Sequence, residues 1–126
     1  DANYISTFSK KWQTGRFSNY EWNQTVTVEV TTLDEMIKVW GRPHFCKIDV
    51  EGFEYQVLKG LSTPIPYISF EFAIEFIDDT KKCINHLKTL GYKLFNFANG
   101  EQANLVFPEW VSEERLGKYI ESSNDR

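Results

Sequence analysis

No two of the seven glycines in this 126-residue sequence are separated by a single residue, so the chain has no Gly-x-Gly loop. Such loops let the backbone approach the phosphates or ribose of a bound nucleotide closely. The chain therefore lacks the motif by which a dinucleotide or nucleoside cofactor is usually recognised. It also has no Gly-x-Ser-x-Gly motif, no His-Glu-x-x-His motif and no Walker-type loop, so the common hydrolase and phosphate-binding signatures are missing.

Basic charge is scarce as well, because 14 Lys and Arg stand against 18 Asp and Glu for a net charge of −4. Sequence-independent binding of nucleic acid needs a basic surface, so we expect no nucleic-acid partner. No apolar run approaches the roughly 20 residues of a membrane span, so we expect no membrane partner. The two cysteines, Cys46 and Cys83, form no Cys-x-x-Cys motif. We expect two reduced, buried thiols in a cytoplasmic protein.

Aromatic residues are abundant at 16%, which excludes disorder over most of the chain. Within residues 1–24 they follow the period of neither a helix nor a strand, and we interpret this segment as an extended aromatic-rich arm packed on a core. Residues 25–111 then form the main α/β part. Residues 112–126 form a terminal helix with a frayed tail.

The main part alternates strands with helices. The alternating Val26, Val28 and Val30 predict a half-buried strand over residues 25–31. Thr32 and Glu35 form a capping box that predicts a helix over residues 33–40. The remaining predicted elements are strands over residues 45–50 and 67–72, helices over 53–61 and 78–90, hairpin strands over 92–97 and 103–107, and a helix after Ser112. This order is typical of an α/β fold with a mostly parallel sheet, closed by an antiparallel hairpin.

Acidic residues follow two of the predicted parallel strands. Asp49 and Glu51 come after the strand over 45–50, and Glu71 and Glu75 come at or after the end of the strand over 67–72. Ligands of open parallel sheets bind beyond the carboxyl ends of the strands, so we expect the four carboxylates to meet at one rim. Such a rim suits a polar substrate, an amine, a metal ion or general-base chemistry.

Two other interpretations of these acids stay open at this point. In the first, Asp49 and Glu51 cap the helix that begins near Phe53, and Glu54 interacts favourably with its dipole. In the second, Asp49, Glu51 and Glu71 form the metal site of a hydrolase. The sequence offers no His ligand at a suitable spacing for that site, so we expect no metal ion.

Several runs resemble the FkbM family of S-adenosylmethionine-dependent methyltransferases. They are Val30–Asp34, Lys47–Glu54, Val57–Gly60, Tyr67–Phe72 and Leu90–Tyr92. The most specific part is the Asp-Val-Glu-Gly-x-Glu core with Leu-Lys-Gly after it. The resemblance covers about residues 26–110.

The resemblance implies a Rossmann-like methyltransferase fold, of which this chain would be a part. It implies S-adenosylmethionine as the cofactor and methyl transfer to a hydroxyl of a sugar or another small metabolite. Asp49, Glu51 and Glu54 fall on the acidic motif of the family. We expect catalytic roles for Asp49 and Glu51, with Asp49 orienting or deprotonating the acceptor hydroxyl, and substrate binding by Glu71 and Glu75. We expect Glu54 to be structural.

In the family, a glycine-rich cofactor strand and an acidic ribose-binding strand precede everything seen here. The sequence therefore resembles the carboxyl-terminal half of such a domain, and no cofactor-binding residue can be named in it. The strand over 45–50 would then present an unpaired edge, and such edges pair with other strands. We expect the arm of residues 1–24 to cover this edge, or an oligomer to form through it. The alternative function is a non-catalytic α/β binding or assembly module.

Overall fold

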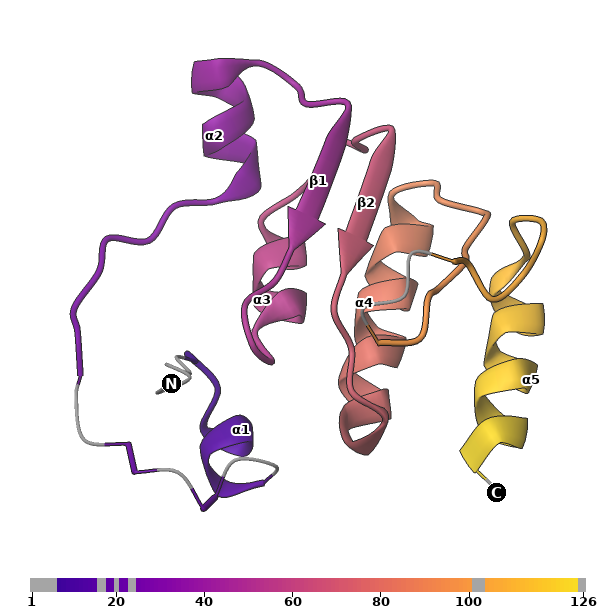
Figure 1. The fold of residues 1–126 in the computed structure, drawn as a ribbon. Helices are drawn as coiled ribbons and strands as arrows, with labels where there is room; N and C mark the ends of the chain where they lie inside the picture. The colour runs from indigo at the N-terminus through magenta and orange to yellow at the C-terminus, as the bar shows by residue number, and fades with distance from the viewer. Residues whose placement is uncertain (1–6, 16–17, 20, 23–24, 101–103, 125–126) are drawn as a thin grey trace. The chain divides into compact units, whose positions relative to one another are not determined.

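The computed structural model describes residues 7–15, 18–19, 21–22, 25–100 and 104–124 (Figure 1). The chain divides into two compact units, Asp1–His86 and Leu87–Arg126. Each unit is described by itself below. Within the described residues, no helix combines the length and the apolar character that crossing a membrane requires.

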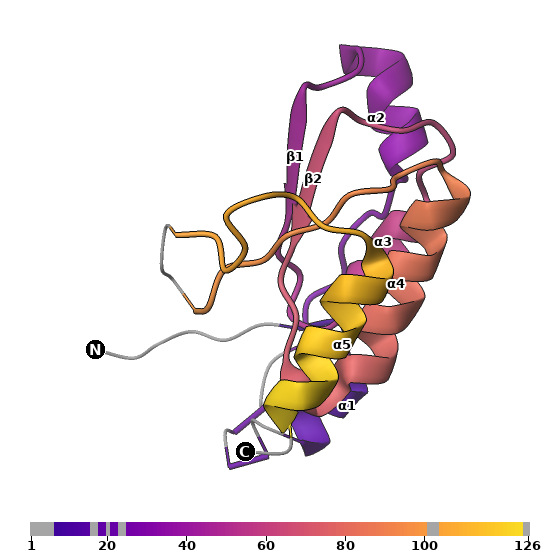
Figure 2. The same ribbon diagram turned by 90° about the vertical axis from the view of Figure 1, so that its right-hand side faces the viewer.

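The first unit is built around one pair of parallel strands, β1 (Phe45–Ile48) and β2 (Tyr67–Phe70). Phe45 pairs with Tyr67 and Ile48 with Phe70, so both strands end at the same level. The connection between them contains helix α3 (Glu54–Lys59), because a parallel pair needs a crossover rather than a tight turn. Figure 2 shows α3 and α4 (Ile77–Thr89) on the same face of the two strands. The predicted strand–helix–strand order is confirmed here, although both strands are shorter than predicted.

Helix α2 (Leu33–Trp40) begins where the sequence predicts it. The hydroxyl oxygen of Thr32 accepts a hydrogen bond from the backbone N–H of Glu35 at 3.2 Å, which satisfies one of the free donors of the first turn. The carboxylate of Glu35 forms an ion pair with Lys38 instead of returning to Thr32. The helix ends at Gly41, which adopts a φ of +85° that a side chain would strain.

The core of the first unit is apolar and lies along β1, α3 and α4. Its buried side chains are Ile48, Leu58, Leu61, Ile65, Ala73, Cys83 and Ile84. Leu58 is fully excluded from solvent. Cys83 is buried as expected, whereas Cys46 is only half-buried, and both are free thiols.

Two further short helices complete the first unit. Helix α1 (Lys10–Thr14) lies in the arm, which is therefore not extended throughout as predicted. The 3-10 helix η1 (Ile74–Phe76) leads from β2 into α4.

The predicted strand over residues 25–31 is wrong. Figure 1 shows this segment as an open coil that runs away from β1. Val26, Val28 and Val30 are 75%, 48% and 84% exposed. A strand is stabilised by its ladder to a neighbour, and in the described residues the sheet contains β1 and β2 alone. Alternating valines without a neighbouring strand therefore remain coil.

The described part of the arm forms no ladder with the outer edge of β1. Among the described residues, β1 pairs with β2 and with no segment of the arm. The arm contacts the chain beyond the carboxyl end of β1 instead, through Thr7, whose hydroxyl donates to the backbone carbonyl of Glu51. Covering a strand edge requires an extended segment that can form a ladder with it. The described part of the arm instead contains the helix α1.

The second unit contains α5 (Glu113–Asn124) and an irregular antiparallel segment. Among the described residues neither predicted hairpin strand is seen, and two isolated antiparallel bridges join Phe95 with Val111 and Ala98 with Leu105. The Asn96 side chain interrupts the ladder, because its amide donates to the carbonyl of Phe107 at 2.9 Å and accepts from the N–H of Phe107 at 3.2 Å. Residue 103, where the second hairpin strand was predicted to begin, lies outside the described residues. Helix α5 continues to Asn124, close to the end of the segment over residues 112–126 in which a frayed tail was predicted.

We expect Leu58→Ala to lower the free energy of unfolding by about 2–5 kcal/mol, because it empties a solvent-free site in the core. Urea denaturation followed by circular dichroism measures the change. Leu94→Ala is the matched control, since Leu94 is 58% exposed and its truncation should cost less than about 0.5 kcal/mol. Equal losses in the two variants would contradict the core assignment.

Candidate acidic site and adjoining cavity

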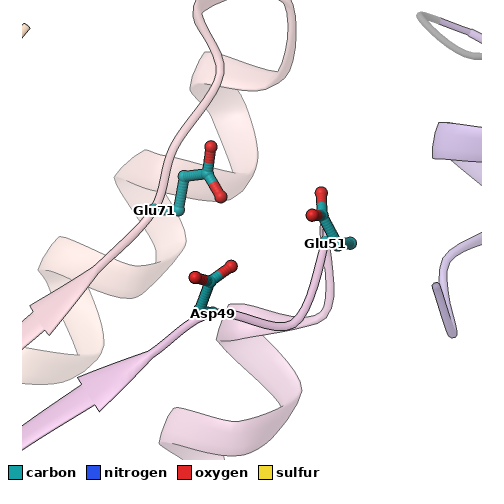
Figure 3. Close-up of side chains that lie close together, drawn as sticks. All are labelled: Asp49, Glu51 and Glu71. Atoms are coloured by element: carbon teal, nitrogen blue, oxygen red, sulfur yellow. The ribbon is translucent and has the colours of Figure 1, made fainter. Parts of the chain in front are cut away.

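The parallel pairing of β1 and β2 brings three carboxylates together. Asp49 and Glu51 follow the carboxyl end of β1, and Glu71 follows the carboxyl end of β2. One carboxylate oxygen from each of the three lies within 4.8 Å of the others (Figure 3). We refer to Asp49, Glu51 and Glu71 as the acidic cluster.

Glu75, the fourth predicted member, is not part of this group. It lies in η1 and is exposed, whereas the carboxylates that converge are those that directly follow the strands. The chain turns away from the sheet at Phe72 and Ala73. Glu75 therefore lies too far along the chain to join the carboxylates at the rim.

The turn after β1 has an uncommon backbone conformation. Glu51 has a φ of +50° and Gly52 a φ of +91°. The left-handed region disfavours a residue with a side chain such as Glu51, so the surrounding structure has to hold it there. The buried carboxylate of Glu54 does so, because its Oε1 accepts from the N–H of Gly52 at 3.1 Å and from the N–H of Val50 at 3.4 Å. The expected structural role of Glu54 agrees with these contacts.

These bonds also settle how α3 begins. Its N-cap residue is Phe53, whose own side chain makes no capping hydrogen bond. Neither Asp49 nor Glu51 therefore occupies the N-cap position of this helix. Their carboxylates lie at the rim instead, where Figure 3 shows them facing Glu71.

The pKa values of two carboxylates in the acidic cluster, Asp49 and Glu71, are shifted in opposite directions. Lys47 lies 2.7 Å from the Oδ2 of Asp49, and its hydrogen bond holds the pKa of Asp49 below the ordinary value. The pKa of Glu71 is raised, first by partial desolvation of its carboxyl group and then by the negative charges of Glu51 and Asp49. Two neighbouring carboxyls with opposite pKa shifts are typical of a pair that divides acid–base work. The shifts place the pKa of Glu71 above that of Asp49, so on acidification Glu71 takes up a proton before Asp49 does.

A cavity of about 580 Å³ adjoins the acidic cluster. Its wall comes from the arm, the start of α3, the segment after β2 and α4. Six aromatic residues line it: Phe8, Phe53, Tyr55, Phe70, Phe72 and Phe76. We call it the aromatic cavity. Glu71 belongs to its lining and to the acidic cluster, so the cavity reaches the rim.

The arm forms one wall of the aromatic cavity through specific contacts. The rings of Phe8 and Phe53 lie with their centroids 5.7 Å apart. Lys11 forms an ion pair with Asp79 of α4 at 2.8 Å. Sequence reasoning missed Phe8, Phe53 and Lys11 as site residues. The available signal was the excess of aromatic residues in the arm, which indicated a covering role without indicating what is covered.

The chemistry of the acidic cluster limits what it can hold. Three carboxylate oxygens at short range attract a cation or a hydroxyl donor, and oxygen ligands of this kind suit Mg²⁺, Ca²⁺ or Mn²⁺ among metal ions. They repel a phosphate or a carboxylate. The rim therefore favours a neutral or cationic ligand that donates hydrogen bonds.

A two-strand parallel sheet with helices on one face and a polar rim at its strand ends defines an α/β domain with its site beyond the sheet. Residues 2–94 match the family model described as the methyltransferase FkbM domain, and the chain belongs to this family. The match includes the acidic cluster and every residue that lines the aromatic cavity. Neither a curated protein nor a solved structure matches the chain significantly.

We expect Glu71→Gln to raise the free energy of unfolding at neutral pH by about 0.5 kcal/mol, the scale of a solvent-screened pair, or about 2 °C in Tm. Glu71 has a raised pKa in the folded chain, so its stabilising contribution is present below the ordinary value and is lost as the pH rises through the raised one. The variant's advantage should therefore vanish in acid. Thermal melts at several pH values measure it, with exposed Glu29→Gln as the control. Destabilisation at neutral pH would show that a favourable partner holds the charge of Glu71.

We expect Glu54→Ala to cost about 2 kcal/mol, because two backbone N–H groups at the turn lose a charged acceptor. Glu54→Gln keeps an acceptor oxygen and should cost less than half as much. Chemical denaturation compares the two variants. If both cost the same, the carboxylate does not stabilise the turn through these bonds.

Proposed function

We propose that this chain is part of an S-adenosylmethionine-dependent methyltransferase that methylates a hydroxyl of a sugar or another small metabolite. The observation that carries the proposal is the acidic cluster, which lies at the rim of a chain that belongs to the FkbM methyltransferase family. Oxygen methylation needs an aligned hydroxyl and a group that takes its proton. A carboxylate with a lowered pKa suits the alignment of the hydroxyl, and one with a raised pKa suits the uptake of its proton.

In the proposed reaction, Asp49 accepts a hydrogen bond from the acceptor and orients it. Lys47 keeps Asp49 ionised and therefore a hydrogen-bond acceptor. Glu71 takes the proton of the hydroxyl, because its raised pKa makes it the stronger base of the pair. Glu51 contributes its negative charge, which helps to raise the pKa of Glu71.

The methyl donor does not fit the described residues. No Gly-x-Gly turn exists in the sequence. Four of the glycines, at positions 41, 91, 100 and 117, have open space where a Cβ would stand, so none of them makes the close approach of a nucleoside cradle. The acidic cluster would also repel the carboxylate of the donor's methionine part. When bound, S-adenosylmethionine supplies the methyl group. We propose that the residues that hold it lie outside this chain and that the chain alone provides the acceptor side.

We expect no micromolar binding when the 126-residue chain is titrated with S-adenosylmethionine in a calorimeter. The physical reason is the missing glycine turn. Micromolar binding would contradict the proposal that this chain is a fragment without the cofactor loop.

In the protein that contains this chain with a cofactor strand, we expect Asp49→Asn to reduce turnover at least tenfold, because an amide cannot replace a charged acceptor at the hydroxyl. Transfer of labelled methyl groups to hydroxylated acceptors measures the change, and circular dichroism checks the fold. Glu29→Gln is the control, since Glu29 is exposed and remote in sequence from the rim. A loss of folding in Asp49→Asn, with no separate effect on turnover, would assign Asp49 a structural role. If the intact protein bound the donor but methylated no hydroxyl, the non-catalytic binding module would replace the proposal.

A further inference from the structure

We propose that the aromatic cavity is the acceptor site and that it takes a neutral alcohol or phenol with an apolar ring rather than a free sugar. The inference rests on the proposed function for calling the ligand an acceptor. The evidence for the ligand class is the lining of the cavity and its continuity with the acidic cluster.

The walls of the cavity are suited to a flat apolar group. Six aromatic residues line it, and a volume of about 580 Å³ lies within the range of sites that bury a drug-sized ligand. Aromatic rings prefer stacked or edge-to-face contact with other flat apolar surfaces. The ring pair of Phe8 and Phe53 shows that the arm and α3 already pack in this way. A free sugar, with hydroxyls around its ring, would bury less apolar surface against these six rings than a flat aromatic ligand would.

The charges along the cavity favour a neutral ligand. Three lysines and three acids line it: Lys10, Lys11, Lys82, Glu54, Glu71 and Asp79. Asp79 forms ion pairs with Lys11 and Lys82, both at 2.8 Å. Glu54 is engaged by the backbone of the turn after β1. Three positive and three negative side chains leave the lining without a net charge, so the cavity supplies no excess charge for an ionic ligand.

Glu71 gives the cavity its polar end. It lines the cavity and also contributes its carboxylate to the acidic cluster. A carboxylate accepts hydrogen bonds and donates none when ionised, so it selects a hydroxyl donor. A ligand with an apolar ring against the phenylalanines would place one hydroxyl at Glu71 and Asp49. This arrangement puts the hydroxyl at the group that takes its proton in the proposed reaction.

Binding of three small probes to the 126-residue chain, with no methyl donor present, tests the inference. The probes are 2-naphthol, naphthalene and methyl α-glucoside, and calorimetry or ligand fluorescence measures their dissociation constants. We expect 2-naphthol to bind about tenfold more tightly than naphthalene, the scale of one hydrogen bond to a charged acceptor. We expect the glucoside to bind more weakly than both.

Matched variants separate the wall from the polar end. Phe53→Leu and Phe8→Leu should each weaken both aromatic probes about fivefold, because a ring contact is lost while bulk is kept. Glu71→Leu should remove the preference for 2-naphthol over naphthalene, because the hydroxyl loses its charged acceptor. Phe45→Leu is the control, because Phe45 lies in β1 outside the cavity lining and is 56% exposed. Phe8 is 60% exposed, so its replacement also tests the wall if Phe53→Leu fails to fold.

Tighter binding of the glucoside than of 2-naphthol would overturn the inference. So would aromatic-probe binding that the Phe8 and Phe53 variants leave unchanged, or no binding of either aromatic probe up to its solubility. These outcomes do not depend on methyl transfer. If the probes bind as expected while the intact protein transfers no methyl group, the cavity stands as a ligand site and the proposed function fails alone.

Discussion

The parallel register of β1 and β2 is the constraint on which the site depends. Ile48 pairs with Phe70, so the residues that follow the two strands emerge side by side although they are far apart in sequence. Glu71 continues this ladder by donating its N–H to the carbonyl of Ile48 at 3.3 Å. A register shift of one residue would turn the side chains of one strand to the opposite face and separate the carboxylates. The position of the acidic cluster is therefore a property of the backbone pairing.

Bringing three acids together carries an electrostatic cost, and the molecule limits this cost in two ways. Lys47 neutralises Asp49, and a raised pKa lets Glu71 lose its charge more easily than an isolated glutamate. The remaining repulsion makes the rim responsive to a hydroxyl donor or a cation, which would relieve it. Titratable groups with perturbed pKa values are frequent at functional sites for this reason.

Local signals in the sequence predicted the local parts of the fold. Thr32 specifies the start of α2 because its hydroxyl bonds within the next turn, and the strand–helix–strand order around α3 was predicted from periodicity and turns. The prediction of a strand over residues 25–31 was wrong. Alternating valines favour an extended conformation, but they form a strand only when a neighbouring strand is present to pair with them.

In the site, too, the features set by neighbouring residues were predicted, and the features set by contacts over a long sequence separation were not. Asp49, Glu51 and Glu71 were predicted to meet because strand ends of a parallel pair meet. Glu75 was misplaced, because the sequence does not show where the chain turns away from the sheet. The wall that the arm contributes through Phe8 depends on docking over a long separation, for which a single sequence carries no periodic signal.

The backbone of Glu51 has a consequence for engineering this protein. At a φ of +50°, glycine would be the less strained residue, so a selection for thermal stability alone favours replacing Glu51. That exchange would remove one of the three charges at the rim. A stability screen without a binding or activity readout would therefore select variants that fold better and have lost part of the site.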